Sequence, residues 1–408
     1  MKSILHTFTF CSLLALNFHL EAFNRSLFYR VSSFWNEPRF ERPWLTTVDV
    51  QLSGGSQNCG RNTCREKVNI LSIYGPESLA TLVPLCAKEV PLLPEKDHFS
   101  FKAVADLFQA DINIYQNFTC GFFTHFHFPI INLDLFPSWH IKENSGDEIP
   151  LRKNAEFKGK SSVNLSALLA HCNLALEPVR EGALSDSTLF FGWTHSYENT
   201  TYLDFIDFTA KMGVLFPTGK GRNENLVLDI PLGYNGHWGI PLSGDISCGA
   251  YDWMTLGIHA DAVFFFKRND CIRMKLDSEA PTGYITLGKG EARVTSGPVW
   301  RAGAYFKADH FYSGLSFLVA CAYEQKNRIV VCPIDQETFS VSHVNKDQRF
   351  KKWSRAFVNM MAEFDFSEQE ASLGPRVSLF YNHQITGKRV FSINTVGCSL
   401  GLEVNWSF

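Results

Sequence analysis

Two pairs of neighbouring residues carry side chains that could take part in catalysis. His195-Ser196 joins a base to a hydroxyl nucleophile, and His259 with Asp261 joins a base to a carboxylate. Nucleophilic catalysis needs a base within hydrogen-bonding reach of the nucleophile and a third group that orients the base. On a strand, consecutive residues face opposite sides, so His195 and Ser196 cannot pair easily, whereas His259 and Asp261 share a face. We therefore interpret His259 and Asp261 as a pair that tunes a pore lining, and we expect no catalytic residue and no enzyme.

Metal and disulfide chemistry have fewer candidates. His125 and His127 share a face two residues apart, but no third ligand is visible, so we predict no metal and no cofactor. The chain has 11 cysteines, of which Cys59 and Cys64 flank a Gly- and Asn-containing segment typical of a loop. A zinc site would need a second closely spaced pair, so we favour a disulfide between Cys59 and Cys64.

Charged residues also recur at alternate positions of long apolar segments. If those segments are strands around a water-filled lumen, their charges select small solutes by size and charge, or brace the wall as ion pairs. The candidate pore-lining residues are Asp207, Lys211, His259, Asp261, Arg301, Lys307, Arg355, Glu363 and Asp365.

The elements that would position these residues are long strands with a period of two. In the last segment, Val396 to Phe408, every second residue is apolar and the residues between them are small or polar. Similar segments of about 9 to 11 residues or more recur along the chain, which is the length that a tilted strand needs to cross a bilayer. We predict about 12 strands, within a range of 10 to 16, near residues 44–53, 98–116, 118–131, 186–197, 202–216, 236–250, 253–266, 298–310, 312–325, 353–366, 376–384 and 389–408.

Strand length and charge placement favour a membrane barrel over a soluble sandwich. Soluble strands average about five or six residues, whereas these segments are about twice as long, and their polar faces hold charges in mid-strand, as a water-filled lumen would tolerate. After the first 22 residues no segment has about 18 consecutive apolar residues, so a membrane crossing would require strands closed into a barrel. Aromatic residues cluster at strand ends, as in interfacial girdles. The predicted fold is all-β: a transmembrane antiparallel up-and-down β-barrel with long loops.

Residues 1–22 have the pattern of a cleavable signal peptide, with Lys2 before an apolar stretch and a small residue, Ala22, at the expected cut. Residues 23–408 then form a single barrel domain with a long loop around 132–185. The net charge of −3 provides no basic field for nucleic acid.

The C-terminal residues resemble the assembly signal of Gram-negative outer-membrane barrels, in which a terminal aromatic follows hydrophobic residues at alternate positions. Here those residues are Leu400, Leu402, Val404, Trp406 and Phe408. The resemblance implies export to the bacterial outer membrane, recognition by the barrel-assembly machinery, contact with outer-membrane lipid and a porin-like fold. Pro217-Thr218-Gly219 resembles strand-to-turn segments of porin-like transport barrels, including channels for hydrophobic compounds.

The predicted function is a porin-like channel for passive passage of small solutes. Two alternatives stay open: an outer-membrane barrel enzyme of the lipase or protease type, and a secreted soluble β-protein. The second is suggested by the glycosylation sequons at Asn24, Asn117, Asn164, Asn199 and Asn405, although a glycan on Asn405 would obstruct strand pairing. A homo-oligomer is possible, but no residue pattern identifies a subunit interface.

Overall fold

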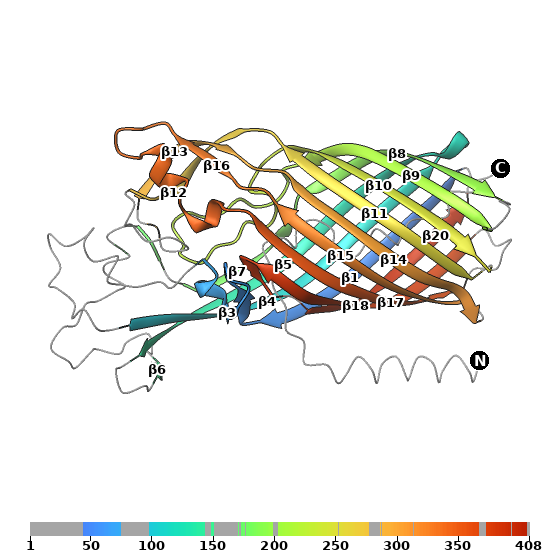
Figure 1. The fold of residues 1–408 in the computed structure, drawn as a ribbon, viewed down its shortest axis with the longest axis horizontal. Coiled ribbons are helices and arrows are strands. Elements are labelled where there is room, and N and C mark those ends of the chain that lie inside the picture. The colour runs from blue at the N-terminus through green and yellow to red at the C-terminus, as the bar shows by residue number, and fades with distance from the viewer. Residues whose placement is uncertain are drawn as a thin grey trace.

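Twelve antiparallel strands form a closed ring in a computed structural model of the chain (Figure 1). Each strand pairs with its neighbours along the chain, and β4 pairs with both β1 and β5, which closes the circle. The structure describes residues 44–74, 98–142, 148–150, 170, 173–175, 177–198, 203–251, 253–276, 286, 288–312, 314–366, 373–392 and 394–405. The ring strands are β1 (Leu45–Gln57), β4 (His98–Asn117), β5 (Phe122–Lys142), β8 (Ser187–Glu198), β9 (Phe205–Phe216), β10 (Gly239–Ala250), β11 (Met254–Phe265), β14 (Val299–Tyr312), β15 (Leu315–Lys326), β17 (Trp353–Asp365), β18 (Leu373–Lys388) and β20 (Asn394–Asn405).

The predicted fold class is confirmed, because each predicted strand segment overlaps one strand of the ring. The main difference lies in β5, which continues to Lys142 instead of ending near residue 131. Two short strands pair with this extension, β6 (Glu148–Pro150) and β7 (Val179–Leu184). Part of the predicted loop around 132–185 is therefore sheet that projects beyond the barrel.

The alternation of side chains separates an apolar exterior from a polar interior. In β20, Leu400 and Leu402 are exposed on the outside, while Ser399 and Glu403 are buried on the inside. Isolated large apolar side chains are common on protein surfaces, but here exposed ones recur around the ring. They include Leu52, Phe108, Ile130, Phe191, Met212, Ile246, Ile258, Phe317, Met360, Leu379 and Leu400. Exposed aromatic residues also mark both ends of the strands, for example Trp253 and Phe264 on β11 and its preceding turn. This is the build of a bacterial outer-membrane β-barrel.

Four aromatic rings lie inside the barrel wall, each on the glycine directly opposite in the neighbouring strand. A Cβ atom on any of these glycines would lie within 2.4 Å of the ring that covers it. The pairs are Phe123 with Gly192, Phe205 with Gly249, Tyr305 with Gly257, and Phe380 with Gly397. The missing side chain leaves room for the ring to lie flat against the backbone, so large aromatic groups fit on a curved wall.

The two ends of the barrel differ. At one end the strands are joined by short connections, such as residues 118–121 and 251–253, and the described termini Trp44 and Asn405 lie here. At the other end the connections are long and carry their own structure. A cap sheet of β12 (Arg268–Met274), β13 (Gly288–Thr295) and β16 (Val330–Pro333) lies there with the short helix α4 (Val341–Val344), as Figure 1 shows.

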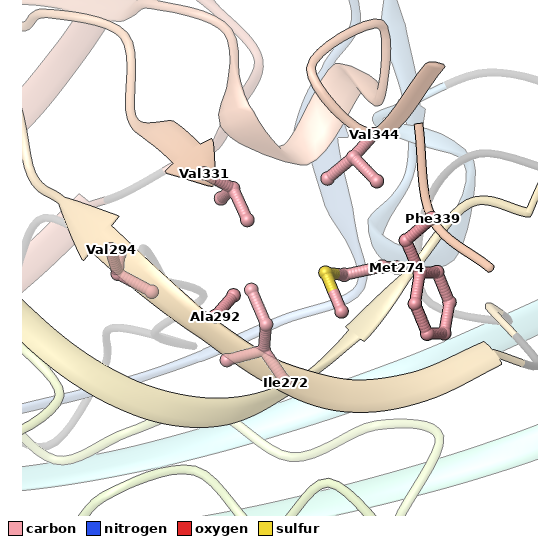
Figure 2. Close-up of a cluster of buried hydrophobic side chains, with 7 residues drawn as sticks. All are labelled: Ile272, Met274, Ala292, Val294, Val331, Phe339 and Val344. Atoms are coloured by element: carbon pink, nitrogen blue, oxygen red, sulfur yellow. The ribbon is translucent and has the colours of Figure 1, made fainter. Parts of the chain in front are cut away.

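The cap sheet has its own small hydrophobic core (Figure 2). One face of the sheet and the α4 segment contribute to it, so these loops fold as an ordered unit. The core side chains are Ile272, Met274, Ala292, Val294, Val331, Phe339 and Val344.

A second small sheet beside the loop end is formed by β19 (Val390–Phe391), β2 (Cys59–Arg61) and β3 (Lys67–Asn69). The disulfide predicted between Cys59 and Cys64 is not formed in this structure. Cys59 is buried within β2, next to the Gln57 amide, whereas Cys64 is exposed in the turn that follows. The hairpin therefore points the two thiols into different environments.

Among the described residues, no helix has the length and apolar character needed to span a bilayer.

The opposite orientation of neighbouring β20 residues predicts a contrast between two substitutions. Leu402→Arg places a charge toward lipid and should cost about 2 to 4 kcal/mol near mid-bilayer. Glu403→Gln changes an inward side chain near Arg376, which keeps three other carboxylates close to it, so this change should cost much less. Refolding yield in detergent, read by heat-modifiable gel migration, measures both. Equal yields for the two variants would contradict the assignment of the faces.

Candidate functional site: the barrel lumen

A belt of alternating charges crosses the inner wall from β9 to β17. Its residues lie directly opposite one another on successive strands, and all of them are buried. The belt consists of Lys211, Ser243, Asp261, Arg301, Glu324 and Arg355. Each inward charge therefore faces an opposite charge or a hydroxyl across the strand pair, an arrangement that stabilises a sheet.

The contacts within the charge belt are short. Arg301 donates from Nε to Oδ2 of Asp261 over 2.6 Å, and its Nη2 lies at the same distance from that oxygen as an ion-pair contact. Arg355 likewise donates from Nε to Oε2 of Glu324, and its Nη2 forms an ion-pair contact with the same oxygen. His259 lies one step along β11 from the belt, with Nε2 2.7 Å from Oδ1 of Asp261. Asp261 thus accepts from both an arginine and a histidine.

A second group of charges lies nearer the short-connection end, around Arg376 of β18. Its guanidinium has four inward carboxylates near it, and Nε lies 3.6 Å from Oε1 of Glu403. Asp365 lies directly opposite Arg376, and Arg376 lies opposite Gly401, where the missing side chain leaves space for the guanidinium. The acidic members of this cluster are Asp49, Glu363, Asp365 and Glu403. Negative charge is in excess in this half of the lumen.

All nine predicted pore-lining residues lie on inward positions of their strands. The structure brings Lys211, Asp261, Arg301 and Arg355 together in the charge belt, with His259 beside it. Glu363 and Asp365 belong to the cluster around Arg376. The other two lie apart: Asp207 faces Ser196 across β8 and β9, and Lys307 pairs with Asp309 on its own strand, Nζ to Oδ2 over 3.0 Å.

His125 and His127, the two histidines considered for metal binding, each contact other side chains of the inner wall. The ring of His125 lies between Tyr115 and Phe190, with its centroid 3.9 Å and 5.6 Å from theirs. Nε2 of His127 lies 3.2 Å from Oδ1 of Asp111. Within the described ranges, no group of three or more His, Cys, Asp or Glu side chains is arranged to hold a metal ion.

His195 and Ser196 face opposite sides of the wall, as predicted. His195 is exposed on the outside and stacks on Trp193 at 5.6 Å between ring centroids, whereas Ser196 lies opposite Asp207 on the inner face. The two side chains do not form a nucleophile and base pair.

Part of the inner wall is apolar. Leu318, Ala320 and Ala322 of β15 face inward with Phe357, Met361 and Phe380 of the next two strands, and Tyr305 packs against them. The Tyr305 hydroxyl also donates to Oδ1 of Asp245 over 3.0 Å. This apolar wall lies between the charge belt and the Arg376 cluster on β17, so the inner surface changes from charged to apolar and back along one strand.

The connection between β9 and β10, residues 217–238, folds over the mouth of the barrel at the loop end. Tyr234 of this mouth loop packs against Leu215, Val263 and Val299, which are inward residues at the ends of three strands. Val227, Leu228, Ile230 and Leu232 of the same loop are almost completely buried. Leu215 breaks the apolar alternation of its strand because it lies under Tyr234 and faces no lipid.

Asp186 holds both ends of the mouth loop. Its Oδ1 accepts from the backbone N–H of Gly219 over 2.9 Å, and its Oδ2 accepts from the N–H of Tyr234 over 2.5 Å. Gly233 lies against the carboxylate with φ of 153°, where a Cβ would come within 2.6 Å of it. Burial raises the pKa of Asp186 to about 6, although the two backbone hydrogen bonds act in the opposite direction.

Two buried arginines tie the cap sheet to the mouth loop. Arg273 of β12 donates to the carbonyl oxygens of Glu224 in the mouth loop and of Asn173, the latter over 2.9 Å. Arg349 donates from Nη2 to the carbonyl oxygen of Arg273 over 2.8 Å and pairs with Asp347. Segments from four connections at the loop end are therefore linked through backbone carbonyls.

Several lumen residues were missing from the prediction. Glu324 escaped because the three inward residues before it on β15, Leu318, Ala320 and Ala322, are apolar, so this part of the strand shows no contrast between its faces. Asp49, Asp245, Arg376 and Glu403 do alternate with apolar neighbours, and that pattern could have identified them. Asp186 lies between two strands, where side chains do not alternate, so no pattern in the sequence indicated its role.

A hollow of about 730 Å³ lies at the short-connection rim, away from the charge belt. Its lining includes the exposed aromatic residues Tyr251, Trp253 and Phe311 beside Asp309 and His310. These aromatic residues belong to the interfacial girdle, so we assign the hollow to the membrane interface and not to the lumen.

Comparisons with known proteins add little at the level of sequence. No protein-family model matches the chain. No curated protein matches it either.

Solved structures that resemble the chain are bacterial outer-membrane proteins. An outer-membrane channel from Pseudomonas putida F1 has a TM-score of 0.49 at 10% identity, with 92% of this chain and 99% of that chain covered. The toluene transporter TodX of Pseudomonas putida has a TM-score of 0.33 at 8% identity, covering 90% and 92% of the two chains. A Pseudomonas aeruginosa FadL homologue has a TM-score of 0.30 at 9% identity, covering 90% and 91%. Similarity this low carries no argument about solutes, and the assignment of the barrel rests on its strand pairing.

The contact between Asp261 and Arg301 predicts strong coupling. Removing one member of a buried ion pair leaves an unpaired charge, so Arg301→Gln should destabilise the barrel by about 3 to 5 kcal/mol. The double variant Asp261→Asn, Arg301→Gln should regain much of this loss. The free energy of unfolding in urea, measured in detergent micelles, tests the cycle. Additive effects would show that the two side chains act independently.

The raised pKa of Asp186 predicts a pH dependence of the mouth loop. The folded-state pKa of about 6 lies above the ordinary value of 3.8, so protonation of Asp186 favours the folded mouth loop. This contribution to the stability of the loop is complete at pH values below 3.8 and is lost as the pH rises through about 6. The change amounts to about 3 kcal/mol at most. Amide hydrogen exchange of Gly219 and Tyr234 should therefore be slower at pH 5 than at pH 7.5, after correction for intrinsic rates.

Asp186→Asn provides the matched comparison for this pH effect. The variant cannot titrate and retains one acceptor oxygen. At low pH, amide exchange at Gly219 or Tyr234 should therefore be faster in the variant than in the wild-type protein, and the corrected rate in the variant should not change with pH. A wild-type loop with equal protection at both pH values would contradict the prediction.

Proposed function

We propose that the chain is an outer-membrane channel for passive passage of small solutes and that its lumen is closed in this conformation. The observation that carries the proposal is the inner wall: inward positions around the ring hold ionisable or hydrogen-bonding side chains, while the outside is apolar. Interior charges of this kind set the field through which a solute passes.

The burial of the lining side chains supports a closed lumen. A wide water-filled lumen leaves its lining accessible, yet Asp261, Arg301 and Glu324 are only 1 to 5% exposed. Their charges pair with each other, and the mouth loop covers the lumen above them. Passage therefore requires the mouth loop to move and the paired side chains to exchange some of their contacts for water or solute.

The charges favour cations. Among the described inward positions of the strands, carboxylates outnumber basic groups, and the imbalance is greatest around Arg376. The carboxylates are Asp49, Asp111, Glu198, Asp207, Asp245, Asp261, Asp309, Glu324, Glu363, Asp365 and Glu403. The basic groups are Lys211, Arg301, Lys307, Lys326, Arg355 and Arg376. Fixed negative charge in a confined space raises the local concentration of cations.

A second candidate is passage of compounds that carry an apolar part, and the apolar wall favours it. Phe357 and Phe380 face the lumen next to charged groups, so a solute with an aromatic ring and a charge finds both surfaces in one cross-section. Faster liposome uptake of an aromatic ammonium ion than of an aliphatic ammonium ion of equal size would support this candidate.

Conductance in planar bilayers tests the proposal. The wild-type barrel should conduct rarely, and a variant in which residues 220–235 are replaced by a short Gly-Ser linker should conduct continuously, since the mouth loop is removed. In a KCl gradient the reversal potential should lie toward that of K⁺, and Glu363→Gln with Asp365→Asn should move it toward zero. Heat-modifiable migration verifies that each variant folds. If the variant that lacks the mouth loop folds but does not conduct, the proposed channel function is wrong. If the barrel conducts but prefers anions, only the proposed preference for cations is wrong.

A further inference from the structure

Six basic side chains from three separate segments meet beside the loop end of β17 and β18. The backbone places them together: Arg61 lies opposite Lys67 in β2 and β3, and opposite Val390 in β19. Arg389 donates from its backbone N–H to the carbonyl of Asn62 and from Nη1 to that of Lys352. The basic patch consists of Arg61, Arg65, Lys67, Lys352, Lys388 and Arg389.

Within the part of the chain that the structure describes, the turn that carries Arg65 and Lys67 also holds one carboxylate, Glu66, which accepts a hydrogen bond from Asn62 and forms no ion pair with the patch. None of the six takes part in an ion pair there. The guanidinium of Arg61 donates to the backbone carbonyls of Arg65 and Ile385, and that of Arg389 donates to the carbonyl of Lys352 and to the side-chain oxygen of Gln348. Nε of Arg61 has no hydrogen-bond partner at all. Like charges directly opposite on neighbouring strands, such as Arg61 and Lys67, destabilise a sheet. An external anion would remove this repulsion.

Two arginines of the basic patch also hold backbone conformations that disfavour them. Arg65 has φ of 69° and Arg389 has φ of 56°, the left-handed region that glycine or asparagine normally occupies. A strained backbone at two positions of one patch is a reason to suspect a functional constraint there. The turns place both arginines at the edge of the small sheet, where their side chains reach outward.

The patch lies where the apolar exterior ends. Lys388 is opposite Ser354 at the loop end of β17, and the exposed apolar side chain of Ile385 lies three residues before it on the outer face. Cations at this level meet the headgroups of a lipid leaflet. Clustered Arg and Lys side chains recognise phosphate, Arg through paired N–H groups and Lys as a point charge.

We propose that the basic patch binds the phosphate groups of lipid headgroups in the leaflet at the loop end of the barrel. The bound phosphates screen Arg61 from Lys67 and hold the β2–β3 hairpin against β17 and β18. This role concerns the outer wall and does not depend on whether the lumen conducts.

Binding of a labelled phosphatidic acid to the full-length barrel tests the proposal. The lipid is presented in mixed micelles of an uncharged detergent, and fluorescence anisotropy reads the binding. The test variant combines Lys67→Gln, Lys352→Gln and Lys388→Gln, whose side chains make no hydrogen bond within the described structure. We expect its Kd for the lipid to rise by roughly ten- to a hundredfold, because each basic group near an anionic surface contributes to binding. Phosphatidylcholine should bind weakly to both proteins.

A variant with the same change in charge is the control. Lys267→Gln, Arg293→Gln and Arg328→Gln alter exposed basic residues near the cap sheet and should leave the Kd near the wild-type value. Equal loss in both variants would show that only the net charge matters and would overturn the proposal. Displacement of the lipid by millimolar inorganic phosphate would also overturn it, since the patch would then be a site for soluble anions.

Discussion

The structure depends on closing twelve strands into one ring. Closure satisfies the backbone hydrogen bonds of every wall strand, which is what allows a sheet to lie in a bilayer, and it also fixes a narrow interior. Polar side chains that point into so small a space lose water, and a buried charge without a partner is costly. The charge belt is the response to this constraint: each of its charges, from Lys211 to Arg355, faces an opposite charge or a hydroxyl on the next strand.

The same constraint explains why the two ends of the barrel are so different. At the short-connection end the strands turn back at once, and the acidic cluster around Arg376 lies close to that end. At the loop end the mouth loop, the cap sheet and the β2–β3 hairpin need cohesion of their own, which comes from the core around Met274 and from Arg273 and Arg349. Asp186 joins the mouth loop to the wall, together with Tyr234, which packs on inward residues of three strands.

Alternation along the sequence predicted the wall well, because a lipid-facing side and a polar side differ at every second residue. It placed twelve strands and the inward orientation of residues such as Asp261 and Arg355. It could not identify partners across strands, which depend on register. It also missed Glu324, because the three inward residues before it are apolar. The cap sheet escaped for another reason: its core joins residues as distant as Ile272 and Val344, and no local pattern connects them. Cys59 and Cys64 are close in sequence, but closeness does not fix the direction of a side chain, and the two thiols lie apart in this structure.

Some predictions lie outside the described residues or await a test. The signal peptide over residues 1–22, and Trp406 and Phe408 of the assembly signal, belong to the first group. Leu400, Leu402 and Val404 do face outward on β20, as the resemblance to outer-membrane assembly signals implies, but recognition by the assembly machinery stays a prediction.

The aromatic rings that lie on glycines also bear on how such a barrel is built. A strand that slips by one residue relative to its neighbour would press the ring of Phe123 or Tyr305 against a side chain and would turn that strand's apolar residues inward. Each ring therefore fits on its glycine only when the two neighbouring strands are in the correct register. If the strands pair one after another, a strand in the wrong register is destabilised by this clash before the barrel closes. At that stage few contacts between strands have formed, so the strand can still shift into the correct register.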